Sequence, residues 1–520
     1  MISRRPARVV RLASPSAVLL LAVVLATGCA DAPERPRLVL LYATCALNRD
    51  YLAPYAPEVS FTPNLARFAS EGVVFERHQS ESGQSGIAFA SLFSGVQAYR
   101  HGVYYHPARL PQDLYLITEA FADAGYDPWF WGAHSMASWD LGYFQGVPDE
   151  HVTYAKPPRK RDQKLALLQP GDPRFAELLD RLEADPDYRA FVVVNFTITH
   201  DPYHIQVFDR DYDRFLERFP EEARGVTRAD FARWWPLYER NRRPLQWNFP
   251  NHVEALGLSE SDVRELARVL EVTYKADVWV LDRLFGRTLE VLRERGLLDR
   301  SLVAFTADHG ETLYRDGTLF KWTHGLQLAP EVLSTPWIVR SGSQSFASDR
   351  YAAVTRSIDV FPTLAGLAGL ELPPDAGPEG VDLTPALLGE AEAPDLLAFS
   401  HTSVIGPRFA DEFKGWQLAG RFYADTDPNL VWARLRRGDR VYKLRNLDGE
   451  RWGFEAFDLA ADPEERRNLF RANDPDHAEM ARRLEEYKQL LVRNYGRNRG
   501  EALSDSETLE RLRALGYIGQ

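Results

Sequence analysis

The sequence predicts an α/β fold with a mostly parallel central sheet and helices on both faces. Continuous apolar runs at 37–42, 191–196 and 302–306 indicate buried strands, because strands of parallel sheets are covered on both faces and lack alternation. Helical segments separate these runs, as expected for strands joined by crossovers. After about residue 398 the pattern changes to short strands and a charged helix, which predicts a smaller C-terminal α+β subdomain.

Start and stop signals define the elements between these strands. Thr62 is a good N-cap, Pro63 suits the first helical turn, and Gly72 marks the helix end. The further elements, in order, are a strand at 73–75, helices at 86–94 and 116–124, a strand at 128–131, a helix at 272–295 that leads into the strand at 302–306, strands at 416–423 and 441–444, and a helix at 477–494.

Length, composition and charge limit the classes of function. With 520 residues, 45% hydrophobic and 26% charged, the chain is typical of soluble globular proteins. At about 150 residues per domain, such a length accommodates one large domain and a smaller one. The net charge of −12, without a basic stripe interleaved with aromatic residues, excludes nucleic acid as an expected partner.

The N-terminus is predicted to be an export signal. Arginines precede an apolar segment at 17–26 that is too short to span a bilayer comfortably. The segment ends in Ala-Thr-Gly-Cys29, which resembles a bacterial lipoprotein signal with Cys29 as the lipidated residue. We therefore expect an exported, lipid-anchored protein of the cell envelope, at the periplasmic or outer-membrane face. An ordinary secretion signal and an unprocessed inner-membrane anchor are the alternatives.

The predicted domain organisation follows from these signals. It comprises a signal peptide at 1–29, a tether at 30–36, an α/β catalytic domain at 37–398 and a C-terminal subdomain at 399–520 with short antiparallel strands and helices. An insertion at about 204–261, rich in Trp, Arg and Pro, is expected to be an excursion from the core. Its tryptophans, 234, 235 and 247, either wall a sugar-binding pocket or pack in the interior, and packing is the favoured interpretation.

Metal-capable side chains follow the strand at 302–306. Asp308 and His309 stand where that strand ends, and open α/β sheets bind ligands at the carboxyl edge of their strands. Carboxylate and neutral imidazole are good ligands for a divalent cation, which can polarise an ester oxygen or organise a nucleophile. The alternative is a solvated aspartate beside a helix-capping histidine.

Several further segments form an ordered series along the chain. They are Thr62-Pro-Asn-Leu65, Glu71-Gly-Val-Val-Phe75, Ala90-Ser-Leu-Phe-Ser-Gly95, Arg100-His-Gly-Val103, His200-Asp-Pro-Tyr203, Thr306-Ala-Asp-His-Gly-Glu311, Thr335-Pro-Trp-Ile-Val-Arg340, Ser357-Ile-Asp-Val-Phe-Pro-Thr-Leu364, Phe457-Asp-Leu-Ala-Ala-Asp-Pro-Glu464 and Asn468-Leu469. Together they resemble the sulfatase family of the alkaline phosphatase superfamily over nearly the whole mature chain. The resemblance implies hydrolysis of sulfate or phosphate esters with a divalent metal ion.

The resemblance places the nucleophile at Ser85, at the mouth of the helix at 86–94. Free backbone N–H groups and the helix dipole favour an oxyanion there, whereas the alternative is that Ser85 is only an N-cap. In sulfatases the nucleophile is a formylglycine made within a Cys/Ser-x-Pro-x-Arg signal. The window Ser85-Gly-Ile-Ala-Phe89 lacks the proline and the arginine, so an unmodified serine is expected.

The resemblance also assigns the metal ligands. Asp308 and His309 match the family's metal-binding pair, but Cys45 replaces the carboxylate that follows the first strand. Thiolate is a poor ligand for calcium and a good one for zinc. We expect one divalent ion, with zinc and calcium both open, and Cys45 as a third ligand beside the Ser85 oxygen. Asp50 is a reserve ligand, and an ordinary buried cysteine is the alternative role for Cys45.

Three more residues match the family's contacts to the ester group. His200, Lys321 and His324 are expected to bind the anion or assist the leaving oxygen. The family's Gly-Lys-x-His segment aligns with residues 132–135, where the lysine is lost. His134 is a candidate substitute for the lost charge, but it is not counted among the predicted site residues.

The leading hypothesis is a sulfatase-like, metal-dependent hydrolase whose substrate is an anionic ester of a glycan or lipid. The first alternative is a phospho-substituent transferase or phosphodiesterase that acts on envelope lipid or glycan. The second is a non-catalytic binding protein with an eroded site, which Cys45 and Phe89 favour.

Overall fold

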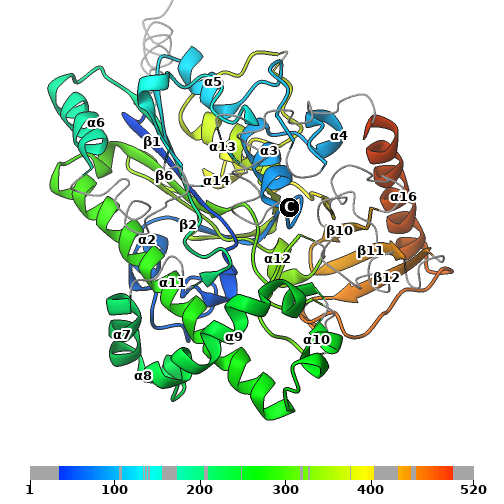
Figure 1. Ribbon diagram of the computed structural model, residues 1–520. Coiled ribbons are helices and arrows are strands. Elements are labelled where there is room, and N and C mark those ends of the chain that lie inside the picture. The colour runs from blue at the N-terminus through cyan, green and yellow to red at the C-terminus, as the bar shows by residue number, and fades with distance from the viewer. Residues whose placement is uncertain are drawn as a thin grey trace, which may run out of the picture. The chain divides into compact units, whose positions relative to one another are not determined.

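An eight-stranded sheet runs through the protein, with helices on both sides (Figure 1). The computed structural model describes residues 34–104, 108–132, 134, 137–138, 141–154, 172–203, 209–247, 249–316, 320–325, 328–374, 376–402, 431–446 and 452–495. Across the sheet the strands are β4 (Val152–Tyr154), β3 (Asp127–Gly132), β5 (Ala190–Phe196), β1 (Leu38–Thr44), β6 (Ser301–Ala307), β7 (Trp337–Ser341), β2 (Val73–Gln79) and β8 (Arg350–Arg356). Neighbours from β4 to β6 are parallel, as are β2 and β8, whereas β7 is antiparallel to β6 and β2. The predicted α/β fold is confirmed.

Two apolar cores cover the two faces of this sheet. In β1, Leu38 and Leu40 point to one face and Val39 and Leu41 to the other, as the two-residue period of a strand requires. The first face is covered by α2 (Pro63–Ser70), α6 (Pro173–Ala184) and α11 (Glu260–Glu294), and the second by α3 (Ser85–Ser94), α5 (Ile117–Asp123) and α13 (Val360–Leu367). Burial on both faces explains why the strands are apolar throughout.

Most element boundaries follow the signals in the sequence, with two differences. α2 begins where predicted, but the Thr62 hydroxyl accepts a hydrogen bond from the Ala53 N–H at 2.8 Å rather than from the first turn of the helix. α11 begins well before residue 272, because Ser259 accepts a capping bond from the N–H of Asp262. Capping chemistry therefore extends this helix into the segment predicted to be an insertion.

The predicted insertion at 204–261 is helical where the structure describes it. It contains α7 (Asp209–Arg218), α8 (Pro220–Ala223), α9 (Arg228–Trp247) and α10 (Phe249–Ala255), which lie in the lower half of Figure 1, and α7, α8 and α9 contact α11. Trp234 and Trp235 are buried in the core of the first face, so the packing interpretation is confirmed for these two. The side chain of Trp247 lies outside the described residues. Several aromatic residues of this segment are buried in the core of the first face, and whether it forms an insertion stays a prediction.

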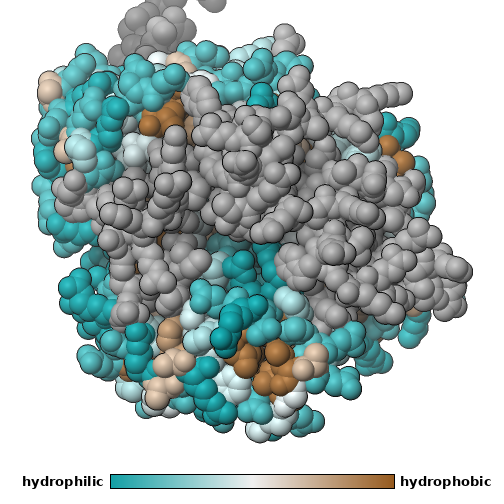
Figure 2. Space-filling model, viewed as in Figure 1, coloured by the Kyte–Doolittle hydropathy of each residue, from teal (hydrophilic) through white to brown (hydrophobic). Residues whose placement is uncertain are grey.

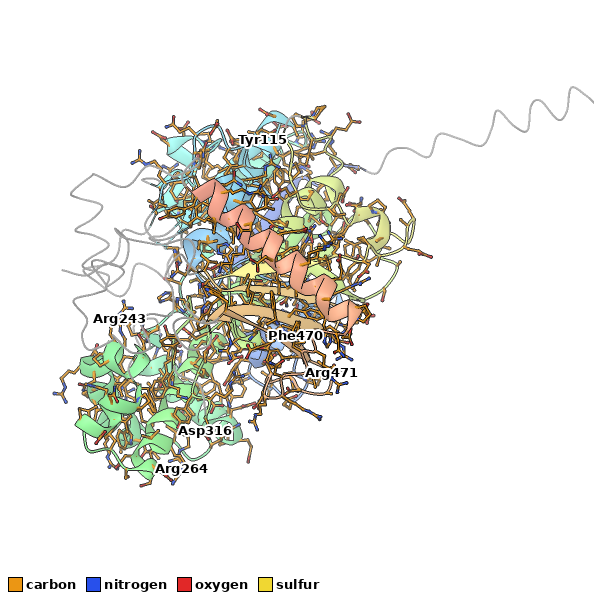
Figure 3. All side chains as sticks on the ribbon, turned by 90° about the vertical axis from the view of Figure 1, so that its right-hand side faces the viewer. Tyr115, Arg243, Arg264, Asp316, Phe470 and Arg471 are labelled. Atoms are coloured by element: carbon orange, nitrogen blue, oxygen red, sulfur yellow. The ribbon has the colours of Figure 1, made fainter. Side chains whose placement is uncertain are left out.

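A second, antiparallel sheet lies in the C-terminal part. Its strands, in order, are β12 (Trp452–Asp458), β11 (Arg440–Asn446), β10 (Ala433–Arg437) and β9 (Ala398–His401), and α16 (Pro475–Tyr495) lies across them (Figure 3). The predicted strand at 441–444 and helix at 477–494 are present, and the smaller α+β part of the fold is confirmed. The strand predicted at 416–423 lies outside the described residues, and the domain boundaries stay predictions.

The N-terminal predictions fall on residues 1–33, outside the described part of the chain. The signal peptide and the lipid anchor therefore stay predictions. Within the described ranges, no helix is both long enough and apolar enough to cross a membrane. On the face drawn in Figure 2, the described surface is mainly hydrophilic, with small apolar areas.

Candidate active and metal site

Cys45 and Asp308 lie side by side because they follow neighbouring parallel strands. Thr44 ends β1 and is paired with Ala307, the last residue of β6. The Asp308 N–H donates to the Thr44 carbonyl at 3.0 Å, which continues the ladder past the strand end. Both predicted residues therefore stand at the carboxyl edge, where sheets of this class bind ligands.

The Asp308 carboxylate has one satisfied oxygen and one unsatisfied oxygen. Oδ1 accepts hydrogen bonds from the N–H groups of Ala46 at 3.2 Å and His309 at 2.6 Å. Ala46 has a φ of 54°, a strained left-handed conformation for a non-glycine residue. Oδ2 is fully buried and has no hydrogen-bond partner among the described residues. Burial accordingly raises the pKa of Asp308.

His309 presents an unprotonated ring nitrogen to the site. Its Nδ1 lies 2.8 Å from the Gly310 carbonyl oxygen. Since a carbonyl can only accept, Nδ1 carries a proton, and in the neutral tautomer with this proton Nε2 carries the lone pair. This Nε2 lies 3.0 Å from Ser85 Oγ and 3.4 Å from Asp308 Oδ2. A serine hydroxyl that donates to such a nitrogen becomes a better nucleophile.

Ser85 is the first residue of α3 and is buried. Gln84 occupies the N-cap position, so the alternative prediction that Ser85 is only an N-cap is wrong. Ser85 Oγ lies 3.0 Å from His309 Nε2 and 3.4 Å from Cys45 Sγ. Because the first turn of a helix leaves N–H groups free and carries partial positive charge, this oxygen stands where an anion is stabilised.

His134 belongs to the site, although the sequence prediction left it out. Its Nε2 lies 3.1 Å from Cys45 Sγ, and ligand atoms of Cys45, His134 and Asp308 all lie within 4.8 Å of one another. All three side chains are fully buried. The signal that would have found His134 is its place just after β3, which is parallel to β5 and ends at the same edge. Burial is the larger cause that raises the pKa of the Cys45 thiol, and the negative charge of the Asp308 carboxylate raises it further.

The predicted residues His200 and His324 extend the site as a row of imidazole rings. Ring centroids are separated by 4.3 Å between His309 and His324, 4.9 Å between His324 and His200, and 6.3 Å between His200 and His134. His324 Nδ1 faces both oxygens of the buried Glu311 carboxylate at 3.3 Å. Burial lowers the pKa of His200 to about 4, so this ring is neutral at pH 7.

Lys321 has aromatic neighbours. Its Nζ lies 4.9 Å from the ring centroid of Tyr314 and 5.4 Å from that of Phe249, and it donates to the Arg315 carbonyl. Burial lowers the pKa of Lys321 to about 8. Its contact with a substrate anion stays a prediction. Asp50, the reserve ligand, has 68% of its side chain exposed, so it lies apart from the buried donors.

The helix α9 holds the two loops that carry the outer histidines. Tyr238 donates its hydroxyl to Asp201 Oδ1 at 2.7 Å, and Arg242 pairs with Oδ2 at 3.3 Å. Gln246 of the same helix donates to the Trp322 carbonyl at 2.7 Å and to the Tyr238 hydroxyl at 3.1 Å. One helix of the predicted insertion thus fixes both loops.

A hydroxyl at a helix start, facing carboxylate, thiol and imidazole groups at the carboxyl edge of a mostly parallel sheet, is suited to a hydrolase that acts on anionic esters. Comparison with known families agrees. The family model described as Sulfatase matches residues 46–370. The chain therefore belongs to the sulfatase family, as the sequence resemblance predicted.

Individual relatives and structures are distant but match most of the chain. N-acetylglucosamine-6-O-sulfatase of Bacteroides thetaiotaomicron is 22% identical, over 95% of this chain and 93% of that protein. Choline-sulfatase of Rhizobium meliloti is 25% identical, over 68% of this chain and 67% of that protein. The crystal structure of a phosphonate monoester hydrolase of Agrobacterium radiobacter shares the fold, with a TM-score of 0.62 at 22% identity over 89% of this chain and 96% of that one. Together the family and these relatives support a hydrolase acting on sulfate esters.

Sulfatases are metal-dependent in general, and the residues at this site fit a cation. Asp308 Oδ2 is buried, and among the described residues it has no hydrogen-bond partner. His309 Nε2 lies 3.4 Å from this oxygen, and in the tautomer whose Nδ1–H donates to the Gly310 carbonyl it carries a lone pair and does not donate. A buried, unsatisfied carboxylate oxygen is costly, and a bound divalent cation would remove this cost.

Proposed function

We propose that the protein hydrolyses sulfate or phosphate esters with Ser85 Oγ as the nucleophile. The observation that carries this proposal is the place of Ser85 Oγ at the start of α3, 3.0 Å from the unprotonated Nε2 of His309. Family membership supports the reaction class. An unmodified serine is proposed because the window 85–89 lacks the proline and arginine of the formylglycine signal.

In this proposal His309 acts as the base that the sequence prediction had assigned to the metal. Its Nε2 accepts the Ser85 proton, and the serine oxygen attacks the sulfur or phosphorus atom. The free N–H groups at the start of α3 stabilise the oxygens that gain charge. A divalent cation held by Asp308 and Cys45 would supply further polarisation of an ester oxygen.

The outer histidines handle the remaining protons. His324 Nδ1 faces the Glu311 carboxylate at 3.3 Å, and this carboxylate favours a protonated ring whose Nε2–H donates the proton to the leaving oxygen. The His200 Nδ1–H donates to the Asp201 carbonyl, and because its pKa is about 4 the ring is neutral at pH 7 and orients the water that cleaves the serine ester. Protonated His309 returns its proton to the Ser85 oxygen as this bond breaks.

The test is turnover of an aryl sulfate, an aryl phosphate and a phosphodiester by purified protein. Ser85→Ala should lower turnover at least about 100-fold. Ser94→Ala is the matched control, since it removes a buried hydroxyl, bonded to the Ala90 carbonyl at 2.6 Å, from the other end of the same helix. Equal turnover in Ser85→Ala would refute the nucleophile. Wild-type protein that turns over none of the three substrates would favour the non-catalytic binding protein.

We also propose an envelope location and a glycan or lipid ester as substrate. The lipoprotein-like N-terminus supports lipid attachment at Cys29, and labelling with a radioactive fatty acid should be lost in Cys29→Ala. The Bacteroides relative is named for a 6-O-sulfated amino sugar, which supports a glycan ester over a lipid one. Faster turnover of sulfated or phosphorylated amino sugars than of phospholipid headgroup esters would agree with this preference, and the reverse order would contradict it.

A further inference from the structure

A buried thiol and a buried imidazole face each other at the candidate site. The distance from Cys45 Sγ to His134 Nε2 is 3.1 Å. Both side chains are fully buried, as is Asp308. The sulfur, one ring nitrogen and one Asp308 carboxylate oxygen all lie within 4.8 Å of one another. The Phe89 ring stands edge-on to His134, with 5.4 Å between centroids, and limits the directions in which the imidazole can turn.

A second, independent observation points to a cation at the same place. Asp308 belongs to this cluster, and its Oδ2 is buried without a hydrogen-bond partner among the residues that the structure describes. Its other oxygen already accepts two backbone N–H groups. Oδ2 lies 3.4 Å from His309 Nε2, and a cation beside it would remove the cost of burying an unsatisfied carboxylate oxygen.

The donor types select the class of ion. Calcium takes six to eight oxygen ligands and magnesium about six, whereas the three-residue cluster offers one carboxylate, one sulfur and one imidazole. Thiolate and imidazole together favour zinc and related ions over calcium and magnesium.

The three donors already stand near the spacing that zinc needs. Zinc ligands at about 2.0–2.3 Å in a tetrahedron stand about 3.3–3.8 Å apart. Cys45 Sγ and His134 Nε2 are slightly closer, at 3.1 Å, and all three donors lie within 4.8 Å of one another, so small side-chain shifts would bring them to zinc distance.

We propose that Cys45, His134 and Asp308 bind a zinc-class ion, with the Ser85 hydroxyl facing its remaining position. The thiol proton passes to solvent when the sulfur binds the ion. This assignment rests on the proposed function for the role of the site, but it concerns only the identity of the metal and its ligands. It adds His134 to the predicted ligands and decides between zinc and calcium.

Cobalt spectroscopy and metal analysis test the proposal on the full-length protein. After loading with zinc, calcium and magnesium together, dialysed protein should retain one zinc ion per chain. Protein loaded with cobalt should show a thiolate-to-cobalt charge-transfer band in the near ultraviolet. Cys45→Ser should abolish the band, and His134→Ala should lower zinc retention at least about tenfold. Cys29→Ser, which removes the other cysteine, should leave both unchanged.

The unfolding transition of each variant shows whether it still folds. The variant Cys45→Asp adds a second measurement of metal preference. This variant replaces sulfur with carboxylate oxygen, so its preference should move from zinc toward calcium or manganese. Wild-type protein that retains calcium instead of zinc, or a charge-transfer band that persists in Cys45→Ser, would overturn the metal assignment. Turnover that depends on Ser85 would in that case still uphold the proposed function. Conversely, a thiolate band without turnover of any ester would uphold the metal assignment and refute the function.

Discussion

The substitution Tyr238→Phe tests whether α9 holds the catalytic loops. The Tyr238 hydroxyl donates to Asp201 Oδ1 at 2.7 Å and accepts from Gln246 Nε2 at 3.1 Å, and all three side chains are buried. A hydrogen bond to a charged group contributes about 1.5–3 kcal/mol, and Gln246 keeps its bond to the Trp322 carbonyl. We expect the free energy of unfolding to fall by about 2 kcal/mol. Because the loop that carries His200 loosens, kcat/KM should fall about tenfold.

Tyr42→Phe is the matched control for this experiment. It removes the same atom from a buried hydroxyl that lacks a partner within the described part of the chain. Since an unsatisfied buried hydroxyl is unfavourable, the free energy of unfolding should stay constant or rise by about 1 kcal/mol. Chemical denaturation measures the free energy of unfolding of both variants. Ester turnover reports whether the loop that carries His200 keeps its position. Equal losses of stability in the two variants, or unchanged turnover in Tyr238→Phe, would refute the positioning role.

Three further predictions address the packing, the pH dependence and the base. Gly83→Ala places a Cβ about 2.6 Å from Val332 Cγ1, so it should cost about 1–3 kcal/mol in thermal or chemical unfolding and lower turnover by shifting the start of α3. Burial lowers the pKa of His101 to about 3, so the unfolded chain protonates below about pH 6.5 while the folded ring stays neutral, and stability falls as the pH drops. His101→Gln, which can keep the bond to Ser91, should lose about 2 kcal/mol less than the wild type between pH 7 and pH 5 in denaturant titrations, and parallel losses would contradict this. His309→Ala should lower turnover at least about 100-fold while zinc stays bound, whereas loss of zinc by metal analysis would restore the ligand role predicted from the sequence.

Much of the fold could be predicted from the sequence because its signals are local. Each central strand is a continuous apolar run, and parallel strands end at one edge, so Cys45 and Asp308 could be expected side by side. The Gly-rich start of the segment before α3, together with the family resemblance, likewise allowed Ser85 to be placed at a helix mouth. The insertion was harder to predict, since Trp234 and Trp235 could pack inward or line a pocket, and the long-range partner face decides between these outcomes.

The rest of the site depends on contacts between distant segments. His134 follows β3, and its contact with Cys45 exists only because β3 pairs with β5 and β5 with β1. No spacing along the chain encodes that order. The bonds from α9 to the loop at 200–203 are similar, because a tyrosine on an amphipathic helix shows no sign of which distant carboxylate it will meet.

The most direct test of the central claim is a trapped ester on Ser85. During turnover of an aryl phosphate or aryl sulfate, rapid quenching and peptide mass spectrometry should show a phosphoryl or sulfuryl group on the peptide that carries Ser85. This group should be absent in Ser85→Ala. An unmodified Ser85 peptide during sustained turnover, or the group attached to Cys45 or His134 instead, would contradict the account.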